Sequence, residues 1–223
     1  MMTATELSKM IDGYNKKVRP SFDKVLFYLN DEFNEEQKTG NYDDDFIRHI
    51  VKGWKKGESA DKEKRIHSHQ NRMPGNSLKK GIERLNNFFI VFKPNEVTFE
   101  DLYDDVKRRF AGIYFCQGPL TVYDVALRIG NMYGIEPKVY VYLCSGAMKG
   151  AKRLLGKSNL PYRVPVSMFP APLCNEPSMY IEDMLCTFKD VFLPKSDKDY
   201  KNIDHILGLD SKCRCLKPHS GCH

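Results

Sequence analysis

Long hydrophobic segments are scarce in this sequence. Even the apolar run from Phe88 to Phe92 is far shorter than the roughly 18 residues that a membrane-spanning helix requires. The first residues reach Glu6 without the basic and then apolar pattern of a secretory signal peptide. We therefore expect a cytoplasmic protein with no membrane span.

The sequence also lacks cysteines arranged as a disulfide framework. Seven cysteines are an odd number, and four of them stand singly in apolar sequence: Cys116, Cys144, Cys174 and Cys186. This arrangement predicts reduced thiols, in agreement with a cytoplasmic location.

Several enzyme signatures are missing. No Walker loop, His-Glu-x-x-His, Gly-x-Ser-x-Gly or dinucleotide fingerprint occurs, so the common nucleotide-binding, metalloprotease and hydrolase classes lose their usual support. What is present is an ordinary globular composition, 41% hydrophobic and 29% charged, which argues against disorder and a fibrous architecture. The excess of 35 Lys and Arg over 29 Asp and Glu gives a net charge of +6 and favours an anionic partner.

The spacing of apolar residues predicts a mainly α fold, a compact multi-helix domain with at most a minor short strand. Helices are expected at 23–33, 43–56, 77–89, 98–110, 122–133, 147–155 and 196–208, and the strand at 138–143. We assign residues 1–212 to this single domain. The polar, basic stretch at about 57–75 predicts a mobile loop, and the five prolines in 160–177 predict extended surface chain.

Three predicted helix starts have a Ser or Thr followed three residues later by Asp, the spacing of a capping box; Ser196 with Asp199 opens the last helix. The other two pairs are Thr98 with Asp101 and Thr121 with Asp124; in each, the two residues are expected to hydrogen-bond to one another's backbone. Gly134 is placed to end the helix that follows Thr121 in a left-handed conformation. One interpretation of Asp124 is therefore structural.

Residues 137–175 contain no Asp or Glu but six Lys and Arg. Ser145 and Gly146 precede a predicted helix, so its free backbone amides predict an anion site. Lys149, Lys152 and Arg153 share a face of that helix by their spacing. This tract predicts contact with phosphate or nucleic acid; the alternative is a solvated helix face.

A glycine turn at Gly118 leads into the predicted helix that holds Tyr123-Asp124-Val125-Ala126 and Arg128-Ile129. This stretch is similar to the Val-Asp-Thr-His stretch of the helix-hairpin-helix DNA glycosylases of the endonuclease III type, whose Asp is catalytic and is followed by an Arg-Val or Arg-Ile pair. The resemblance implies DNA contacts at Gly118 and Arg128. It also implies that Asp124 stabilises charge on the sugar or activates water while a damaged or modified base leaves.

Aromatic residues near this stretch are candidate stacking surfaces for a flipped base: Tyr114, Phe115, Tyr123, Tyr133, Tyr140 and Tyr142. The alternative for all of them is packing in the core.

The carboxyl-terminal tail, residues 213–223, concentrates cysteine and histidine. Thiolates and imidazoles at close spacing are typical zinc ligands, so Cys213, Cys215, His219 and Cys222 are candidates for a zinc site. The alternative is a tail without a metal.

Taken together, these features predict a DNA-binding protein with glycosylase-like activity that removes a damaged or modified base. The alternative is a helical module that binds nucleic acid or protein without catalysis.

Overall fold

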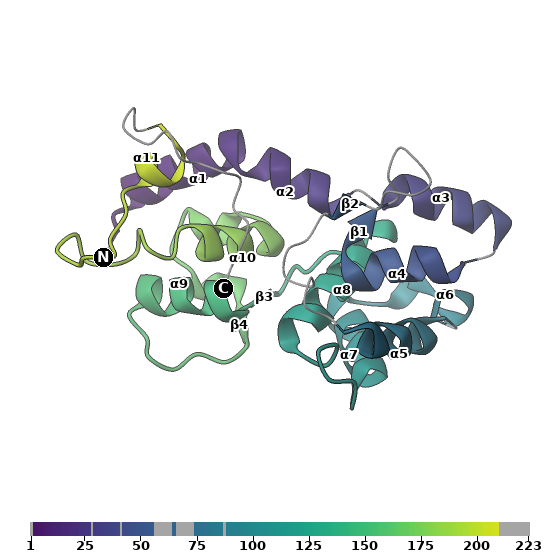
Figure 1. The fold of residues 1–223 in the computed structure, drawn as a ribbon. Coiled ribbons are helices and arrows are strands. Elements are labelled where there is room, and N and C mark those ends of the chain that lie inside the picture. The colour runs from purple at the N-terminus through teal and green to yellow at the C-terminus, as the bar shows by residue number, and fades with distance from the viewer. Residues whose placement is uncertain are drawn as a thin grey trace. The chain divides into compact units, whose positions relative to one another are not determined.

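The computed structural model describes residues 2–27, 29–40, 42–55, 64–65, 74–86 and 88–209. The described chain is mainly helical, as predicted, with two small antiparallel pairs of strands (Figure 1). It divides into two compact units. The terminal unit joins the segment up to Phe22 to the segment from Pro137 onward, and the central unit is Asp23–Glu136.

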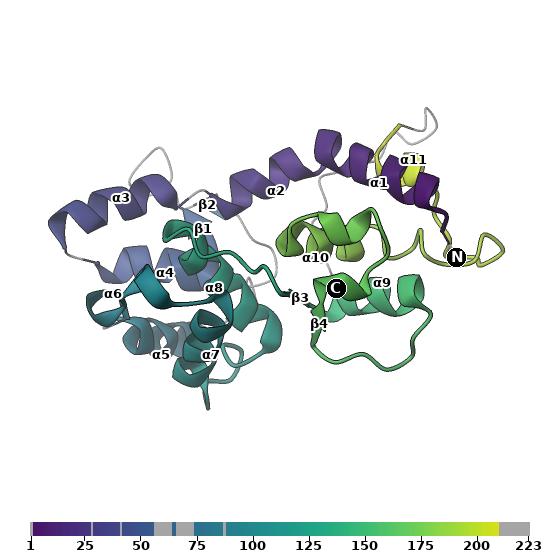
Figure 2. The same ribbon diagram turned by 180° about the vertical axis from the view of Figure 1, so that it is seen from behind.

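The terminal unit contains both the first and the last described helices, coloured purple and yellow in Figures 1 and 2. Its elements are α1 (Ala4–Lys17), β3 (Tyr140–Tyr142), α9 (Ser145–Leu155), β4 (Arg163–Pro165), η2 (Val166–Met168), η3 (Leu173–Asn175), α10 (Ser178–Thr187) and α11 (Ile203–Ile206). The strands β3 and β4 pair with Val141 opposite Val164, and both residues are buried. The helix α2 (Arg19–Leu26) crosses from this unit into the next.

The central unit is helical around an aromatic core. Its elements are α3 (Asn30–Thr39), α4 (Asp44–Lys52), β1 (Trp54–Lys55), β2 (Lys64–Arg65), α5 (Gly75–Leu85), α6 (Phe88–Val91), η1 (Pro94–Glu96), α7 (Phe99–Phe110) and α8 (Pro119–Met132). Phe33 meets the edge of Tyr133 at 4.9 Å between ring centroids, and Phe46 meets Phe89 at 5.6 Å. These rings join α3, α4, α6 and the end of α8, since aromatic pairs at such distances stabilise beyond their buried area.

Several predicted helix ends are confirmed. Thr98 and Asp101 form both hydrogen bonds of a capping box at the start of α7, and Gly134 has a left-handed φ of 70° just beyond α8. The strand prediction is confirmed within Tyr140–Tyr142. The helix predicted at 147–155 begins slightly earlier, at Ser145.

Other predicted ends are wrong. The helix expected at 23–33 is broken between Leu26 and Asn30, and the one expected at 43–56 ends at Lys52 because Gly53 turns left-handed, with φ at 67°. The helix expected at 77–89 runs from Gly75 to Leu85, and Phe88–Val91 is a separate turn. The helix expected at 196–208 is only Ile203–Ile206, because Asn202 is its N-cap.

The start of α8 is also corrected. Thr121 is not its N-cap, because the helix begins three residues earlier, with Gly118 as N-cap and Pro119 in the first turn. The Thr121 hydroxyl instead donates backward to the Phe115 carbonyl at 3.1 Å. The expected extended chain at 160–177 contains β4 and two short 3-10 turns. Most of the predicted loop at 57–75, and all of 213–223, lie outside the described residues.

Two glycines let α9 pack closely on α10. A β-carbon built on Gly150 would lie 2.1 Å from the Leu185 carbonyl oxygen, and one on Gly146 would lie 2.3 Å from the Cys186 sulfur. At Gly150 the obstacle is backbone, which has little freedom to move aside. The position of α9 against α10 therefore depends on the missing side chain of Gly150.

We predict that Gly150→Ala lowers the free energy of unfolding by about 1 to 3 kcal/mol, the usual range for an overpacked core. Helix propensity alone would change it in the opposite direction, because alanine is the better helix former by about 1 kcal/mol. Thermal and urea denaturation measure the effect. Gly75→Ala is the matched control, since a β-carbon there meets nothing within 4 Å; equal stability of the two variants would contradict the packing argument.

Candidate nucleic-acid interface

The candidate residues Asp124 and Arg128 lie in the interior of the central unit. Both belong to α8, and their exposed fractions are 6% and 2%. Nη1 of Arg128 donates to the carbonyl of Ile50 in α4 at 2.6 Å. This hydrogen bond ties the middle of α8 to the end of α4, so Arg128 has a structural role whatever else it does.

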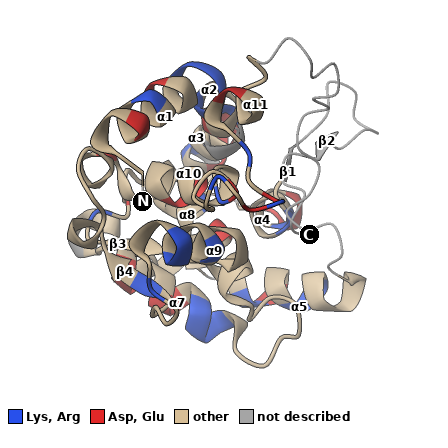
Figure 3. Cartoon of the chain, turned by 90° about the vertical axis from the view of Figure 1, so that its left-hand side faces the viewer, with Lys and Arg blue, Asp and Glu red and all other residues tan. Residues whose placement is uncertain are grey.

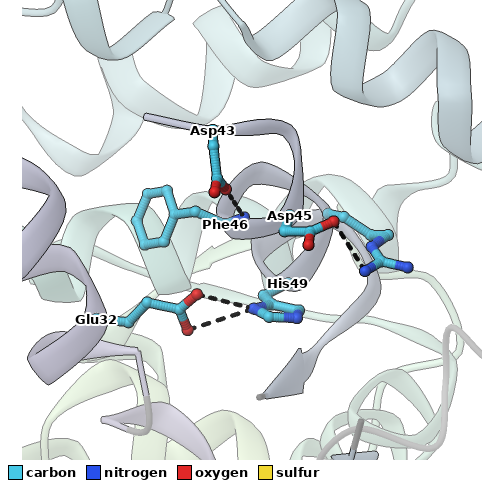
Figure 4. Close-up of polar contacts among 6 residues, drawn as sticks. Glu32, Asp43, Asp45, Phe46 and His49 are labelled. Atoms are coloured by element: carbon cyan, nitrogen blue, oxygen red, sulfur yellow. Dashed lines mark hydrogen bonds and ion pairs between the residues drawn. The ribbon is translucent and has the colours of Figure 1, made fainter. Parts of the chain in front are cut away.

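The helix α4 that receives this bond is itself held by polar contacts (Figure 4). The carboxylate of Asp43 accepts from the Phe46 amide at 2.7 Å and caps the helix. The buried His49 ring contacts the Glu32 carboxylate of α3, with Nδ1 at 3.0 Å from Oε1. Arg48 pairs with Asp45 at 2.9 Å on the outer side. These contacts fix the carbonyl that Arg128 uses.

The basic candidates lie on α9 in the terminal unit (Figure 3 colours Lys and Arg blue). Lys149 is exposed and Lys152 half-buried. Arg153 is engaged within the protein, because its Nη1 donates to Asp190 and to the Lys189 carbonyl, both at 2.8 Å. Ser145 is exposed at the first turn, whereas Gly146 is the close contact with Cys186.

The predicted site residues are therefore divided between two units. Gly118, Asp124 and Arg128 belong to the central unit, while the α9 candidates belong to the terminal unit. The zinc candidates Cys213, Cys215, His219 and Cys222 lie outside the described residues. Within the described part of the chain, no group of three or more His, Cys, Asp or Glu side chains is placed to hold a metal ion.

The structure separates the candidate aromatic residues by exposure. Tyr123 and Tyr142 are buried in the core. In contrast, Tyr114 is 72% exposed and Phe115 43% exposed, and their rings meet edge to face at 4.6 Å. We call Tyr114 and Phe115 the aromatic tip. Composition and spacing gave no means of distinguishing these two residues from the buried ones.

The aromatic tip is built into a braced turn between α7 and α8. Buried Ile113 precedes it and buried Cys116 follows it. The amides of Cys116 and Gln117 both donate to the Ile113 carbonyl, at 3.1 and 3.0 Å, and the Gln117 side chain accepts from the Gly112 amide at 3.1 Å. The turn thus presents two large rings to solvent from a fixed backbone.

Phe115 has a φ of 69°, the only positive value for a non-glycine residue in the described chain. A bulky side chain in this region costs about 1 to 3 kcal/mol and persists only where surrounding contacts impose it. Here the hydrogen bond from Thr121 to the Phe115 carbonyl and the burial of Cys116 impose it. Burial raises the pKa of the Cys116 thiol to about 11, so the thiol stays protonated near neutral pH and acts as an apolar anchor.

The helices α5 and α7 of the same unit carry exposed lysines. Cys116 Sγ donates to the Ser77 carbonyl at 3.5 Å, which places the first turns of α5 beside the aromatic tip. Lys79 and Lys80 are exposed there, and Lys107 is exposed in the last turn of α7. An exposed ring pair with neighbouring cations is the combination by which proteins hold unpaired bases and their phosphates.

In comparisons with known proteins, no family model, curated protein or solved structure matches the chain. In the described residues, no helix is both long enough and apolar enough to cross a membrane.

We predict that Arg128→Leu lowers the free energy of unfolding by about 2 to 3 kcal/mol, because it removes a charged hydrogen bond to a buried carbonyl. Denaturation of the purified variant measures this loss. Arg108→Leu is the control: Arg108 is 78% exposed and pairs with Asp105 on the surface, so its removal should change stability by less than about 0.5 kcal/mol. An unchanged free energy of unfolding in Arg128→Leu would contradict the structural role of Arg128.

Proposed function

We propose that this protein binds DNA and that the aromatic tip stacks on bases that are not paired. The observation that carries the proposal is the exposure of Tyr114 and Phe115 on a braced turn. Large exposed rings are costly in water, and their backbone is held in an unfavourable conformation at Phe115. Such strain is characteristic of functional sites, and a planar π-surface offered to solvent suits a base.

Charge supports the same partner. The chain carries a net charge of +6, which attracts a polyanion irrespective of sequence. The side chains of Lys79, Lys80 and Lys107 are exposed on α5 and α7 of the same unit, so this unit offers cations to the phosphates of a strand that stacks on the aromatic tip. Since rings recognise any base face, we expect binding with little sequence preference.

The test replaces Tyr114 and Phe115 by alanine, singly and together, and measures affinity for a fluorescent single-stranded oligonucleotide by anisotropy. Stacking contributes roughly 1 to 3 kcal/mol per base, so each substitution should weaken binding by about tenfold. Alanine keeps the β-carbon, so the strain at Phe115 is not relieved. Tyr114→Phe should bind like the wild type, because stacking needs the ring and not the hydroxyl.

Phe27→Ala is the matched control, since Phe27 is another exposed phenylalanine of the central unit, 41% exposed. It should leave the affinity unchanged. Wild-type affinity should also fall steeply with added salt and be higher for single strands than for a duplex. If the double alanine variant bound as tightly as Phe27→Ala, the stacking role would be excluded; a salt-independent affinity would remove the nucleic-acid proposal.

Base removal by Asp124 is a separate prediction, motivated by the resemblance to the glycosylases. Because Asp124 is buried in α8, a flipped base reaches its carboxylate only if the central unit opens locally. Wild-type protein is incubated with duplexes that contain damaged or modified bases, and abasic sites are counted. Activity in the wild type that is lost in Asp124→Asn supports catalysis; no abasic sites with either protein leaves a binding module without this activity.

A further inference from the structure

The terminal unit contains a pocket whose lining includes no residue of the aromatic tip. The pocket, of about 760 Å³, opens between the start of α1, the last turn of α9 and the chain from Val191 to Asp204. This volume falls in the range of small-ligand sites, roughly 300 to 1,000 Å³. The DNA-binding proposal does not use the pocket.

The lining of the pocket carries an excess of positive charge. Its cations are Lys9, Lys152, Arg153 and Lys195, and its carboxylates are Glu6 and Asp204, which leaves a formal charge of +2. A cavity with a net positive charge attracts anionic ligands, because the surrounding protein screens the field less than water does.

The four cations differ in how firmly they are held. Arg153 is fixed by Asp190 and the Lys189 carbonyl, and Lys9 is paired with Asp204 at 2.9 Å. Nζ of Lys152 makes no hydrogen bond or ion pair with any residue that the structure describes, although the side chain is half-buried. Because no described residue pairs with this ammonium, it is available to an anionic group of a ligand.

Lys195 is the second available cation. Its Nζ lies 3.5 Å from Glu6 Oε1, and the lysine side chain is 77% exposed. The carboxylate of Glu6 is already engaged, because its Oε2 accepts from the Thr3 amide at 2.9 Å. An exposed ion pair of this length contributes little, so Lys195 can turn to a ligand anion at small cost.

The remaining lining is partly aromatic. Phe192 and Tyr200, both half-buried, line the pocket together with Leu193 and Ile203. Apolar walls with a few placed cations suit a ligand that has a flat apolar part and an anionic group. A sulfate or phosphate alone would leave those walls in contact with water.

We infer that this pocket binds a nucleoside 5′-phosphate, with the phosphate between Lys152 and Lys195 and the base against Phe192 and Tyr200. The same chemical group occurs in a free nucleotide and at the 5′-phosphorylated end of a strand. Charge-assisted hydrogen bonds from the two ammonium groups hold the phosphate, and stacking holds the base.

Calorimetric titration of the full chain with adenosine 5′-monophosphate tests the inference. The nucleotide should bind at least tenfold more tightly than either adenosine or inorganic phosphate, since each of these satisfies only half of the pocket. Lys152→Gln should weaken nucleotide binding at least tenfold. Lys198→Gln is the matched control, because Lys198 is exposed in the same segment but does not line the pocket, and it should bind as the wild type does.

A measurement on the unmodified protein guards against misfolding of the variant. Adenosine 5′-monophosphate should slow acylation of Lys152 by an amine-selective reagent, read by mass spectrometry, while leaving Lys198 unchanged. Lack of nucleotide binding at millimolar concentration, or equal affinities of the Lys152→Gln and Lys198→Gln variants, would overturn the inference.

Two further experiments distinguish a free nucleotide from the 5′-phosphorylated end of a strand and separate this inference from base stacking at the aromatic tip. Competition by a 5′-phosphorylated oligonucleotide, but not by its 5′-hydroxyl counterpart, supports a strand end; competition by neither supports a free nucleotide. The variant with alanine at both Tyr114 and Phe115 should keep its nucleotide affinity. The experiments therefore test base stacking at the aromatic tip and nucleotide binding in the pocket independently of each other.

Discussion

The arrangement of the central unit depends on one buried guanidinium. Arg128 stands in the middle of α8 and donates to the Ile50 carbonyl of α4, while the same helix begins immediately after the turn that carries the aromatic tip. A charged group held away from water stabilises a structure only when its partners stay in place. The polar contacts that Asp43, His49 and Glu32 make at α4 hold this partner in place, so α8 is tied to α4 in the core.

In the terminal unit, the position of a helix is set by the absence of a side chain. With no side chain at Gly150, the α9 backbone lies directly on the Leu185 carbonyl, and this contact sets where the last turn of α9 lies. Lys152 and Arg153 follow in that turn. Arg153 is held by Asp190, while Lys152, one residue earlier, remains available to a ligand; both residues line the pocket. Lys152 and Arg153 are neighbours on one helix and carry the same charge, yet only Arg153 is held by other residues of the protein.

Local signals predicted the parts of the fold that local interactions determine. Thr98 and Asp101 cap α7 as their spacing indicated, because both hydrogen bonds lie within four residues. The break between α2 and α3 has no such signal: apolar spacing continues across it, and the start of α3 is held by Asn131, whose Nδ2 donates to Asn30 Oδ1 from 101 residues away. At α8 the sequence holds a second start signal, since proline in the first turn marks a helix start and Pro119 precedes Thr121.

For the candidate sites, too, the sequence predicts only part of what the fold shows. Residue type identified Lys149, Lys152 and Arg153 as one basic face, but only the fold shows that Arg153 is engaged and that Lys152 lines a pocket. Likewise, six aromatic residues were equivalent in sequence, and the burial of Ile113 and Cys116 on either side of Tyr114 and Phe115 is what turns those two rings outward. Charge alone attracts any polyanion. The outward placement of the two rings is therefore set by their buried neighbours, and that placement is a property of the folded turn.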